Sequence, residues 1–295
     1  MYYNPKSHQK SEYGYRLLGD IFRQLTGADF MAFYIFVVAI GLLIWLLCTR
    51  KLFHQERYGI LLLLFMPFYG YFYFGVTIRN ALAEIIVYGA FVTFLLAKRY
   101  RWILYVSLVI LASFIHRSSL AFLIVIFFAN ANLKSFHLLV IYGLCVCFWL
   151  MSGFDFAQGV LLQISQLDVL SKVSHFANRS LMNTNMFSLQ NIVAFIMMLL
   201  CIMQKDCITS RYQRIYSFFL NVSLVGLFVM SLFWHVPTAY RFYNMFFFFN
   251  FPILYLVTFH NKLVNINLLK YSFAVLFSII YFSTLIYCNP FFLLY

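Results

Sequence analysis

Five ionisable residues interrupt otherwise apolar segments of this chain, and they are the residues most able to do chemistry. Arg79 and Glu84 lie in VTIRNALAEII, His116 and Arg117 lie in SFIHRSS, and Arg241 lies in VPTAYRFYN. Ionisable side chains are costly in lipid and by default line a protein interior or a wet cavity. Guanidinium groups hold phosphate oxygens through bidentate, charge-assisted hydrogen bonds. The three arginines therefore predict a site for a phosphate-bearing ligand.

Each of these residues also has a structural explanation. The arginines and the histidine could extend to the membrane surface, or they could pair inside a helix bundle. Among the eight acidic residues only Glu84 lies in an expected span, and it is five residues from Arg79 rather than the three or four that favour pairing. This surplus of arginines favours an anion site. Glu84 could be a base or a counterion, and His116 could be a base, an acid or a neutral hydrogen bonder.

The elements that must position these residues are membrane helices. The chain of 295 residues is 64% hydrophobic, 22% aromatic and only 10% charged, which is typical of a polytopic membrane protein. Apolar runs near the length of about 20 residues that a crossing needs recur along it. The expected spans lie near 30–47, 59–77, 80–97, 102–115, 118–132, 136–152, 189–203, 215–235, 242–259 and 270–287.

The expected fold class is therefore all-α, a polytopic transmembrane helix bundle of about ten spans that forms a single integral membrane domain over 1–295. A GT-C-like glycosyltransferase bundle would be one form of it. No cleavable signal peptide is expected, because the segment 1–29 has no apolar core. The six cysteines suit neither a disulfide framework nor a zinc site.

Two segments outside the spans predict amphipathic surface helices on the outer face. In 1–29, apolar residues recur at helical spacing, namely Tyr15, Leu18, Phe22 and Leu25. In 153–188, which we expect to be an external loop, the same spacing is shown by Val160, Ile164, Leu167 and Leu170.

Basic residues cluster in three short loops, which is the usual mark of the cytoplasmic side. These residues are Arg50, Lys51 and Arg57; Lys98, Arg99 and Arg101; and Lys205, Arg211 and Arg214. This pattern explains the net charge of +13 without a nucleic-acid partner. All three loops can face inward only if the apolar run 102–132 breaks at SFIHRSS, where one helix ends and another returns. The N-terminus is then outside, Lys134, Lys262 and Lys270 are inside, and the arginines and histidine of the predicted site lie at outer ends of spans.

Four short elements, in this order, resemble the EpsG family of bacterial polysaccharide polymerases, which are related in function to Wzy-type O-antigen polymerases. They are Glu12-Tyr-Gly-Tyr15, Arg79-Asn-Ala-Leu-Ala83, His116-Arg-Ser-Ser119, and Tyr240-Arg241 followed by Tyr243. The resemblance covers most of the chain from Glu12 to about residue 285. Members of this family usually begin with a further transmembrane helix and a Gly-Thr-Asp-Tyr-like loop, and this chain starts after both.

The resemblance implies polymerisation of lipid-linked repeat units at the periplasmic face of the bacterial inner membrane, in O-antigen, capsule or exopolysaccharide biosynthesis. A growing glycan would move from undecaprenyl diphosphate to a new repeat unit. Arg79 and Arg241 would hold the diphosphate leaving group, with Arg117 as a secondary contact. His116 would orient or deprotonate the acceptor hydroxyl, and Glu84 is the other candidate base.

By the same resemblance, Glu12, Tyr240 and Tyr243 are expected to bind substrate. The expected partners are an undecaprenyl-diphosphate-linked oligosaccharide and the lipid bilayer, together with a chain-length regulator and a flippase. No cofactor is expected. A metal-independent enzyme is predicted, because the chain has no Asp-x-Asp pair that could supply hard oxygen ligands.

Two other functions would also need a basic intramembrane site. A flippase for lipid-linked oligosaccharides should show charges at the midplane and broken helices in repeated halves, whereas these residues gather on one side. A membrane-bound acyltransferase could use an intramembrane histidine, but a neutral thioester has no need of the surplus arginines.

Overall fold

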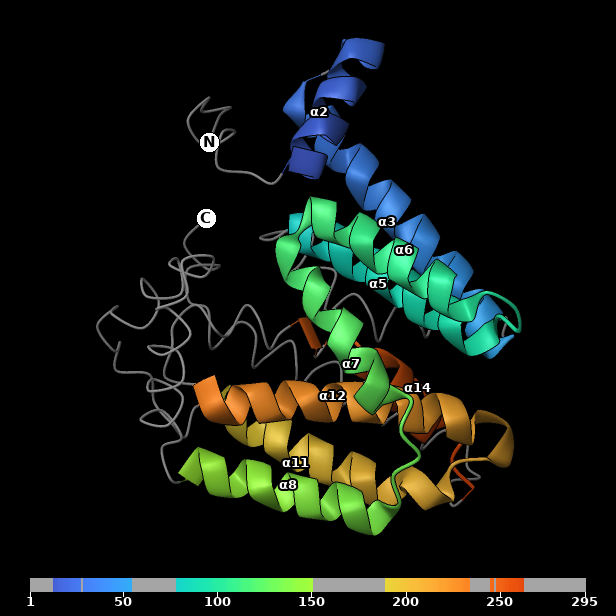
Figure 1. Ribbon diagram of the computed structural model, residues 1–295, viewed down its shortest axis with the longest axis vertical. Helices are drawn as coiled ribbons and strands as arrows, with labels where there is room; N and C mark the ends of the chain where they lie inside the picture. The colour runs from blue at the N-terminus through green and yellow to red at the C-terminus, as the bar shows by residue number, and fades with distance from the viewer. Residues whose placement is uncertain are drawn as a thin grey trace. The chain divides into compact units, whose positions relative to one another are not determined.

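The computed structural model describes residues 13–27, 29–54, 78–150, 189–233, 245–246 and 248–262. In this part of the chain the structure is almost entirely helical (Figure 1), with one isolated antiparallel β-bridge between Ile208 and Asn261. The all-α fold class is thereby confirmed for these residues. The expected spans 59–77 and 270–287 and the expected loop 153–188 lie outside the described residues.

The chain divides into two compact units, Met1–Ile126 and Phe127–Tyr295. A single membrane domain over 1–295 stays a prediction. The described helices of the first unit are α2 (Tyr13–Thr26), α3 (Phe30–Phe53), α5 (Ile78–Leu96), α6 (Arg101–Ile115) and the 3-10 helix η2 (Arg117–Ala121). Helix α7 (Phe122–Ala129) crosses the boundary between the units.

Three described helices are long and apolar enough to cross a membrane, and they make the chain an integral membrane protein. They span Met31–Phe53, Ile78–Leu96 and Ser210–Leu232. Helix α3 starts where the Asp29 carboxylate accepts a hydrogen bond from the Ala32 backbone N–H at 3.0 Å. It ends at His54, which adopts the left-handed conformation with φ of 50°. Arg50 and Lys51 in its last turn complement the negative end of the helix dipole.

Helix α5 forms the core of the first unit, between α3 and α6 (Figure 1). Its apolar window is 72% buried, compared with 22% for α3, so α3 is left to face lipid. The Tyr88 and Thr49 hydroxyls lie 3.2 Å apart and join α5 to α3. On the other side of α5, the Phe91 ring stacks on Tyr105 of α6 at 5.9 Å.

The apolar run 102–132 breaks at His116, as the sequence predicts. Helix α6 ends where the His116 N–H donates to the Ala112 carbonyl, and His116 itself is extended (φ −148°, ψ 111°). The Tyr105 hydroxyl donates to the Phe122 carbonyl at 2.5 Å, although Tyr105 lies about 15 Å before the end of α6 at 1.5 Å per residue. The chain must therefore turn back after His116 for Phe122 to reach Tyr105.

The helices on either side of this turn, α6 before it and η2 with α7 after it, correspond to the expected spans 102–115 and 118–132. Both are too short for a full membrane crossing. Helix α6 has 15 residues, η2 has five and α7 has eight. A helix that crosses a bilayer needs about 20 residues. One apolar run is too short to supply two complete crossings. If the Arg101 end lies at one membrane surface, the His116 turn lies about 22 Å above it, inside the hydrocarbon thickness of about 30 Å. Irregular backbone at that depth is tolerated only where protein covers it or water reaches it.

Helix α2 is the amphipathic helix that the sequence predicts. Its aromatic side chains pack on α3, with ring centroid distances of 5.5 Å between Tyr15 and Phe33 and 4.8 Å between Phe22 and Phe36. Leu25, on the predicted apolar face, does not pack on α3 and is 80% exposed. At about 3.6 residues per turn, Leu25 points roughly 80° away from Tyr15, too far round the helix to reach α3.

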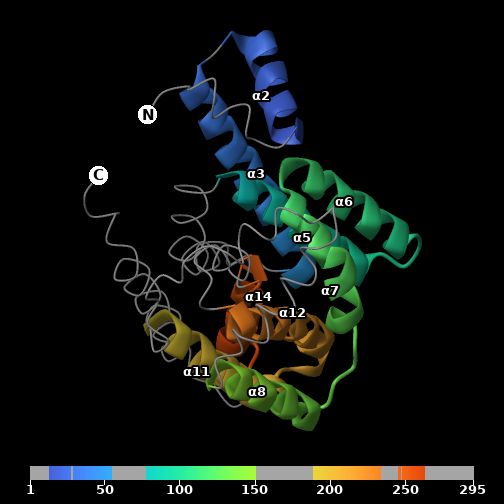
Figure 2. The same cartoon turned by 60° about the vertical axis from the view of Figure 1, so that its left-hand side comes forward.

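The second unit is built around α12 (Gln213–Phe233), which contacts each of its other long helices. These are α8 (Ser135–Leu150), α11 (Leu189–Gln204) and α14 (Asn250–Phe259). Figures 1 and 2 both show α8, α11 and α12 packed together. The buried Asn221 of α12 donates to the carbonyls of Phe128, Ala129 and Ala131 at 2.9 to 3.3 Å. It thereby satisfies carbonyls that the end of α7 leaves without helical partners.

Three loops contact one another at one end of the second unit. They contain Lys134, residues 204–214 and Lys262. The segment 204–214 contains the 3-10 helices η4 (Lys205–Cys207) and η5 (Ser210–Tyr212). The Lys205 ammonium donates to the Leu133 carbonyl, and the Ser135 hydroxyl donates to the Asp206 carboxylate at 2.7 Å. The Lys262 N–H donates to the Cys207 carbonyl at 2.8 Å. The Lys134, 204–214 and Lys262 loops are all expected on the cytoplasmic side, and their contacts with one another agree with this expectation.

Candidate functional site

Half of the predicted site residues lie in the described part of the chain, and all of these belong to the first unit. They are Arg79 and Glu84 on α5, His116 at the end of α6, and Arg117 at the start of η2. Glu12, Tyr240, Arg241 and Tyr243 lie outside the described residues, so their roles stay predictions.

The α5–α6 hairpin brings Arg79 and His116 to the same end of the first unit. The two helices pack against each other, and only Ala97–Tyr100 separates them, with Tyr100 in the left-handed conformation (φ 57°) that closes the turn. Helices joined by so short a connection run antiparallel. The start of α5 therefore lies beside the end of α6, although Arg79 and His116 are far apart in the sequence.

The opposite end of the same hairpin carries the basic loop. The Arg101 guanidinium lies 5.1 Å from the centre of the Phe94 ring, and that of Arg99 lies 4.8 Å from the Tyr100 ring. At 1.5 Å per residue, Arg79 is about 26 Å along α5 from the Leu96 end, and His116 is about 22 Å along α6 from Arg101. The predicted one-sided placement thus agrees with the packing of this unit.

Glu84 lies deeper than the other residues of the group. Its side chain is fully buried, and the neighbouring positions Asn80–Ile85 are buried as well. It is about 18 Å from the Leu96 end of α5, so it lies roughly 4 Å below the His116 turn. Extension of Glu84 into lipid is excluded by this burial, which leaves the base and the counterion as its alternatives.

His116 and Arg117 are the accessible members of the group. His116 is half-buried and Arg117 is exposed, so Arg117 can either reach the membrane surface or contact a ligand. The Ser119 backbone N–H donates to the His116 carbonyl at 3.0 Å, and the Ser119 side chain is fully buried. This bond fixes the backbone of the turn while the His116 imidazole stays accessible.

Tyr15 of α2 lies within the influence of the Arg79 charge, although its spacing predicts only a place on the apolar face of a surface helix. Burial raises the pKa of Tyr15 to about 12, against the opposing effect of the nearby Arg79 charge. The residue before it, Gly14, lies against the Phe114 backbone near the end of α6. The sequence signal for Tyr15 is the Glu12-Tyr-Gly-Tyr15 element, in which the resemblance implies a substrate role for Glu12 alone.

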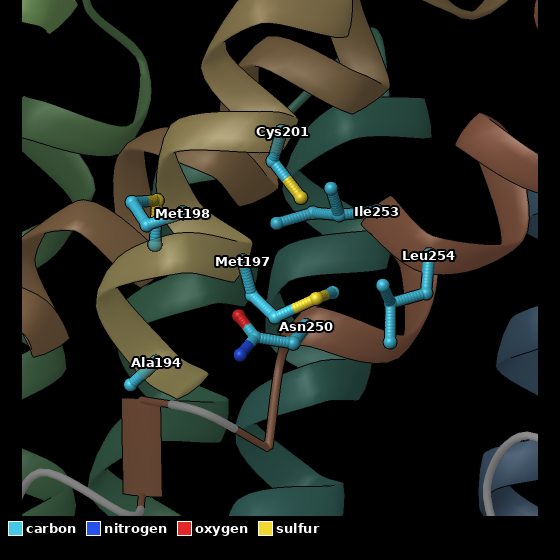
Figure 3. Close-up of a pocket in the computed structure, with 7 residues that line it drawn as sticks. All are labelled: Ala194, Met197, Met198, Cys201, Asn250, Ile253 and Leu254. Atoms are coloured by element: carbon cyan, nitrogen blue, oxygen red, sulfur yellow. The ribbon is translucent and has the colours of Figure 1, made fainter. Parts of the chain in front are cut away.

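A small cavity in the second unit has none of the described site residues in its lining. Figure 3 shows it between α11 and α14, with Met197, Cys201, Asn250, Ile253 and Leu254 among its lining residues. Its volume is about 10 Å³, roughly the space of one water. It is too small for a sugar or a phosphate head group.

Comparison with known proteins gives one match. The sequence model of the EpsG family matches residues 1–295, which include both units and all the predicted site residues. No match was found among curated proteins or among solved structures.

Proposed function

The chain belongs to the EpsG family over its whole length, and on this premise we propose that it polymerises lipid-linked oligosaccharide repeat units during polysaccharide biosynthesis. The non-reducing sugar hydroxyl of a new unit attacks the anomeric carbon of a glycan carried on undecaprenyl diphosphate. A glycosidic bond forms as the bond from that carbon to the phosphate oxygen breaks. The hydroxyl proton goes to a base, and undecaprenyl diphosphate leaves with the negative charge.

One observation carries this proposal. Arg79 and the His116 turn lie at the same end of the α5–α6 hairpin, and the basic loop lies at the opposite end. With the basic end of the hairpin at one membrane surface, Arg79 lies about 26 Å above it by helix length, close to the far edge of a hydrocarbon layer of about 30 Å. A lipid-linked diphosphate presents its charged group just at the edge of the hydrocarbon layer. A guanidinium at that level can hold a phosphate oxygen while the lipid tail stays in the bilayer.

The described residues have separate roles in this proposal. Arg79 stabilises the diphosphate as it leaves, and Arg117 supplies a second, more accessible cation. His116 orients or deprotonates the acceptor hydroxyl. Glu84, buried below the turn, supports that step as a counterion or serves as the alternative base. Arg241, with Tyr240 and Tyr243, would complete the clamp on the diphosphate, and Glu12 would contact sugar.

The arrangement favours a polymerase over a lipid-linked oligosaccharide flippase. A transporter that alternates access is expected to bind its substrate near the bilayer midplane. In the first unit, by contrast, Arg79 lies at the end of α5 and His116 at the end of α6. An acyltransferase could use His116, but a thioester acyl donor gives Arg79 no anion to hold at this face.

The test is the Arg79→Ala variant in cells that carry the polysaccharide pathway. In this variant the negative charge on the departing diphosphate loses its guanidinium partner. The amount of polymer should therefore fall by about 100-fold or more, while single lipid-linked units still accumulate. Arg79→Lys should restore little, since an ammonium lacks the planar fork. The matched control is Arg99→Ala, at the other end of the same hairpin, which should polymerise normally. Normal polymer in Arg79→Ala at equal protein level would remove Arg79 from the site.

A further inference from the structure

Helix α2 packs directly against the end of α6. The contact is at Phe114, two residues before His116. A Cβ atom added at Gly14 would lie 2.6 Å from the Phe114 carbonyl oxygen, so only glycine permits this approach. Figures 1 and 2 both show the start of α2 next to the end of α6. The residue that follows, Tyr15, is therefore held at the level of the turn by main-chain contact on one side.

The Tyr15 ring is fixed on its other side by α3. Its centroid lies 5.5 Å from that of Phe33, in a tilted arrangement. The hydroxyl is buried and has no hydrogen-bond partner among the residues that the structure describes. A buried donor without an acceptor costs free energy. Within the described part of the chain, the Tyr15 hydroxyl is such a donor, and its position within the field of Arg79 suits an anionic ligand.

We infer that the Tyr15 hydroxyl donates a hydrogen bond to the diphosphate that Arg79 holds, and so acts as a neutral second donor in the leaving-group site. This inference rests on the proposed function and names a substrate-binding residue for it. A phenol donates without adding another charge to a site that already concentrates arginines. Burial keeps the Tyr15 pKa near 12, so the hydroxyl retains its proton at neutral pH and can donate throughout the reaction.

The test is Tyr15→Phe in purified full-length protein in nanodiscs, with undecaprenyl diphosphate as the probe. The phenylalanine ring keeps the packing on Phe33, so the fold and the melting temperature should not change. Binding of undecaprenyl diphosphate should weaken by about tenfold or more, the usual effect of losing a hydrogen bond to a charged group. The matched control is Tyr13→Phe, because Tyr13 is on the same helix and is 64% exposed. That variant should bind the probe like the wild type.

A second variant separates binding from packing. Gly14→Ala should displace α2 from Phe114, and Tyr15 should move away with the helix. Binding of undecaprenyl diphosphate should therefore weaken to a similar extent. If both changes act through the same hydroxyl, the double variant Gly14→Ala/Tyr15→Phe should bind no worse than Gly14→Ala alone.

The outcomes distinguish this inference from the function on which it rests. Wild-type binding in Tyr15→Phe, alongside weak binding in Arg79→Ala, would overturn the role of Tyr15 and leave the polymerase proposal standing. A lower melting temperature with unchanged binding would show that the hydroxyl serves packing only, and it would also overturn the inference. If Arg79→Ala binds the probe normally, the diphosphate site itself is wrong.

Discussion

The two units of the molecule put their polar side chains to different uses. In the second unit these groups hold the backbone: Asn221 donates to three carbonyls around the end of α7, and Lys205 donates to the Leu133 carbonyl. In the first unit Arg79, His116 and Tyr15 come from three helices to one end of the hairpin. A polar residue in an apolar span is therefore a weak sign of function until its packing is known.

The contrast also separates two kinds of cationic residue. Lys205 is buried although it lies in a basic loop, because it satisfies a carbonyl and sits beside Asp206. Arg117 is exposed although it lies between apolar helices. A basic residue that marks membrane orientation thus becomes part of the packing of the second unit, while in the first unit Arg117, away from the basic loop, stays exposed.

The largest effect that would test this contrast is expected at His116. His116→Gln keeps a hydrogen-bonding side chain but cannot take a proton, so polymerisation by purified protein should fall by about 100-fold or more if His116 is the base. The melting temperature should not change, because the turn is held by main-chain bonds. His137→Gln, at an exposed histidine of the second unit, is the control. Wild-type rates in His116→Gln would limit His116 to orienting the acceptor, and wild-type rates in His116→Ala would exclude it from the site.

An intermediate effect, on stability rather than on chemistry, is expected at Asn221. Asn221→Ala removes the donor from three carbonyls in the second unit and should lower the free energy of unfolding by about 1 to 3 kcal/mol. Thermal unfolding in detergent measures this loss, and the activity per folded molecule should stay the same. The control is Asn132→Ala, at an exposed asparagine of the loop that follows α7, which should change stability by less than about 0.5 kcal/mol. A loss of turnover in fully folded Asn221→Ala would contradict the division of roles between the units.

The smallest effect is expected on removal of metal ions. If arginines supply the positive charge at the leaving group, their permanent protonation makes a divalent cation unnecessary. Polymerisation in nanodiscs should then change by less than about twofold with excess EDTA, whereas high salt should slow it by screening the exposed charges. Loss of turnover in EDTA and recovery with Mg²⁺ would refute the arginine clamp. Glu84 with Glu12 or Asp155 would then become the first residues to examine as metal ligands.

Much of the first unit could be predicted because its signals are local in sequence. Helix α3 and α5 follow from apolar length alone, and the break at His116 follows from a polar cluster inside an apolar run together with the parity of the basic loops. The amphipathic helix α2 follows from helical spacing. Leu25 nevertheless stays exposed, because spacing defines an apolar face but not the part of it that a neighbouring helix covers.

The sequence by itself determined the membrane class, the helices and the residue types able to hold a diphosphate, because hydropathy, turn residues and charge act over a few turns of chain. Only the tertiary structure decided which of these residues meet. It ended α7 at Ala129, buried Glu84 below the His116 turn and brought Tyr15 next to that turn. These outcomes depend on close packing between helices distant in sequence, such as the seat of Gly14 on Phe114, where one methyl group would force the backbones apart.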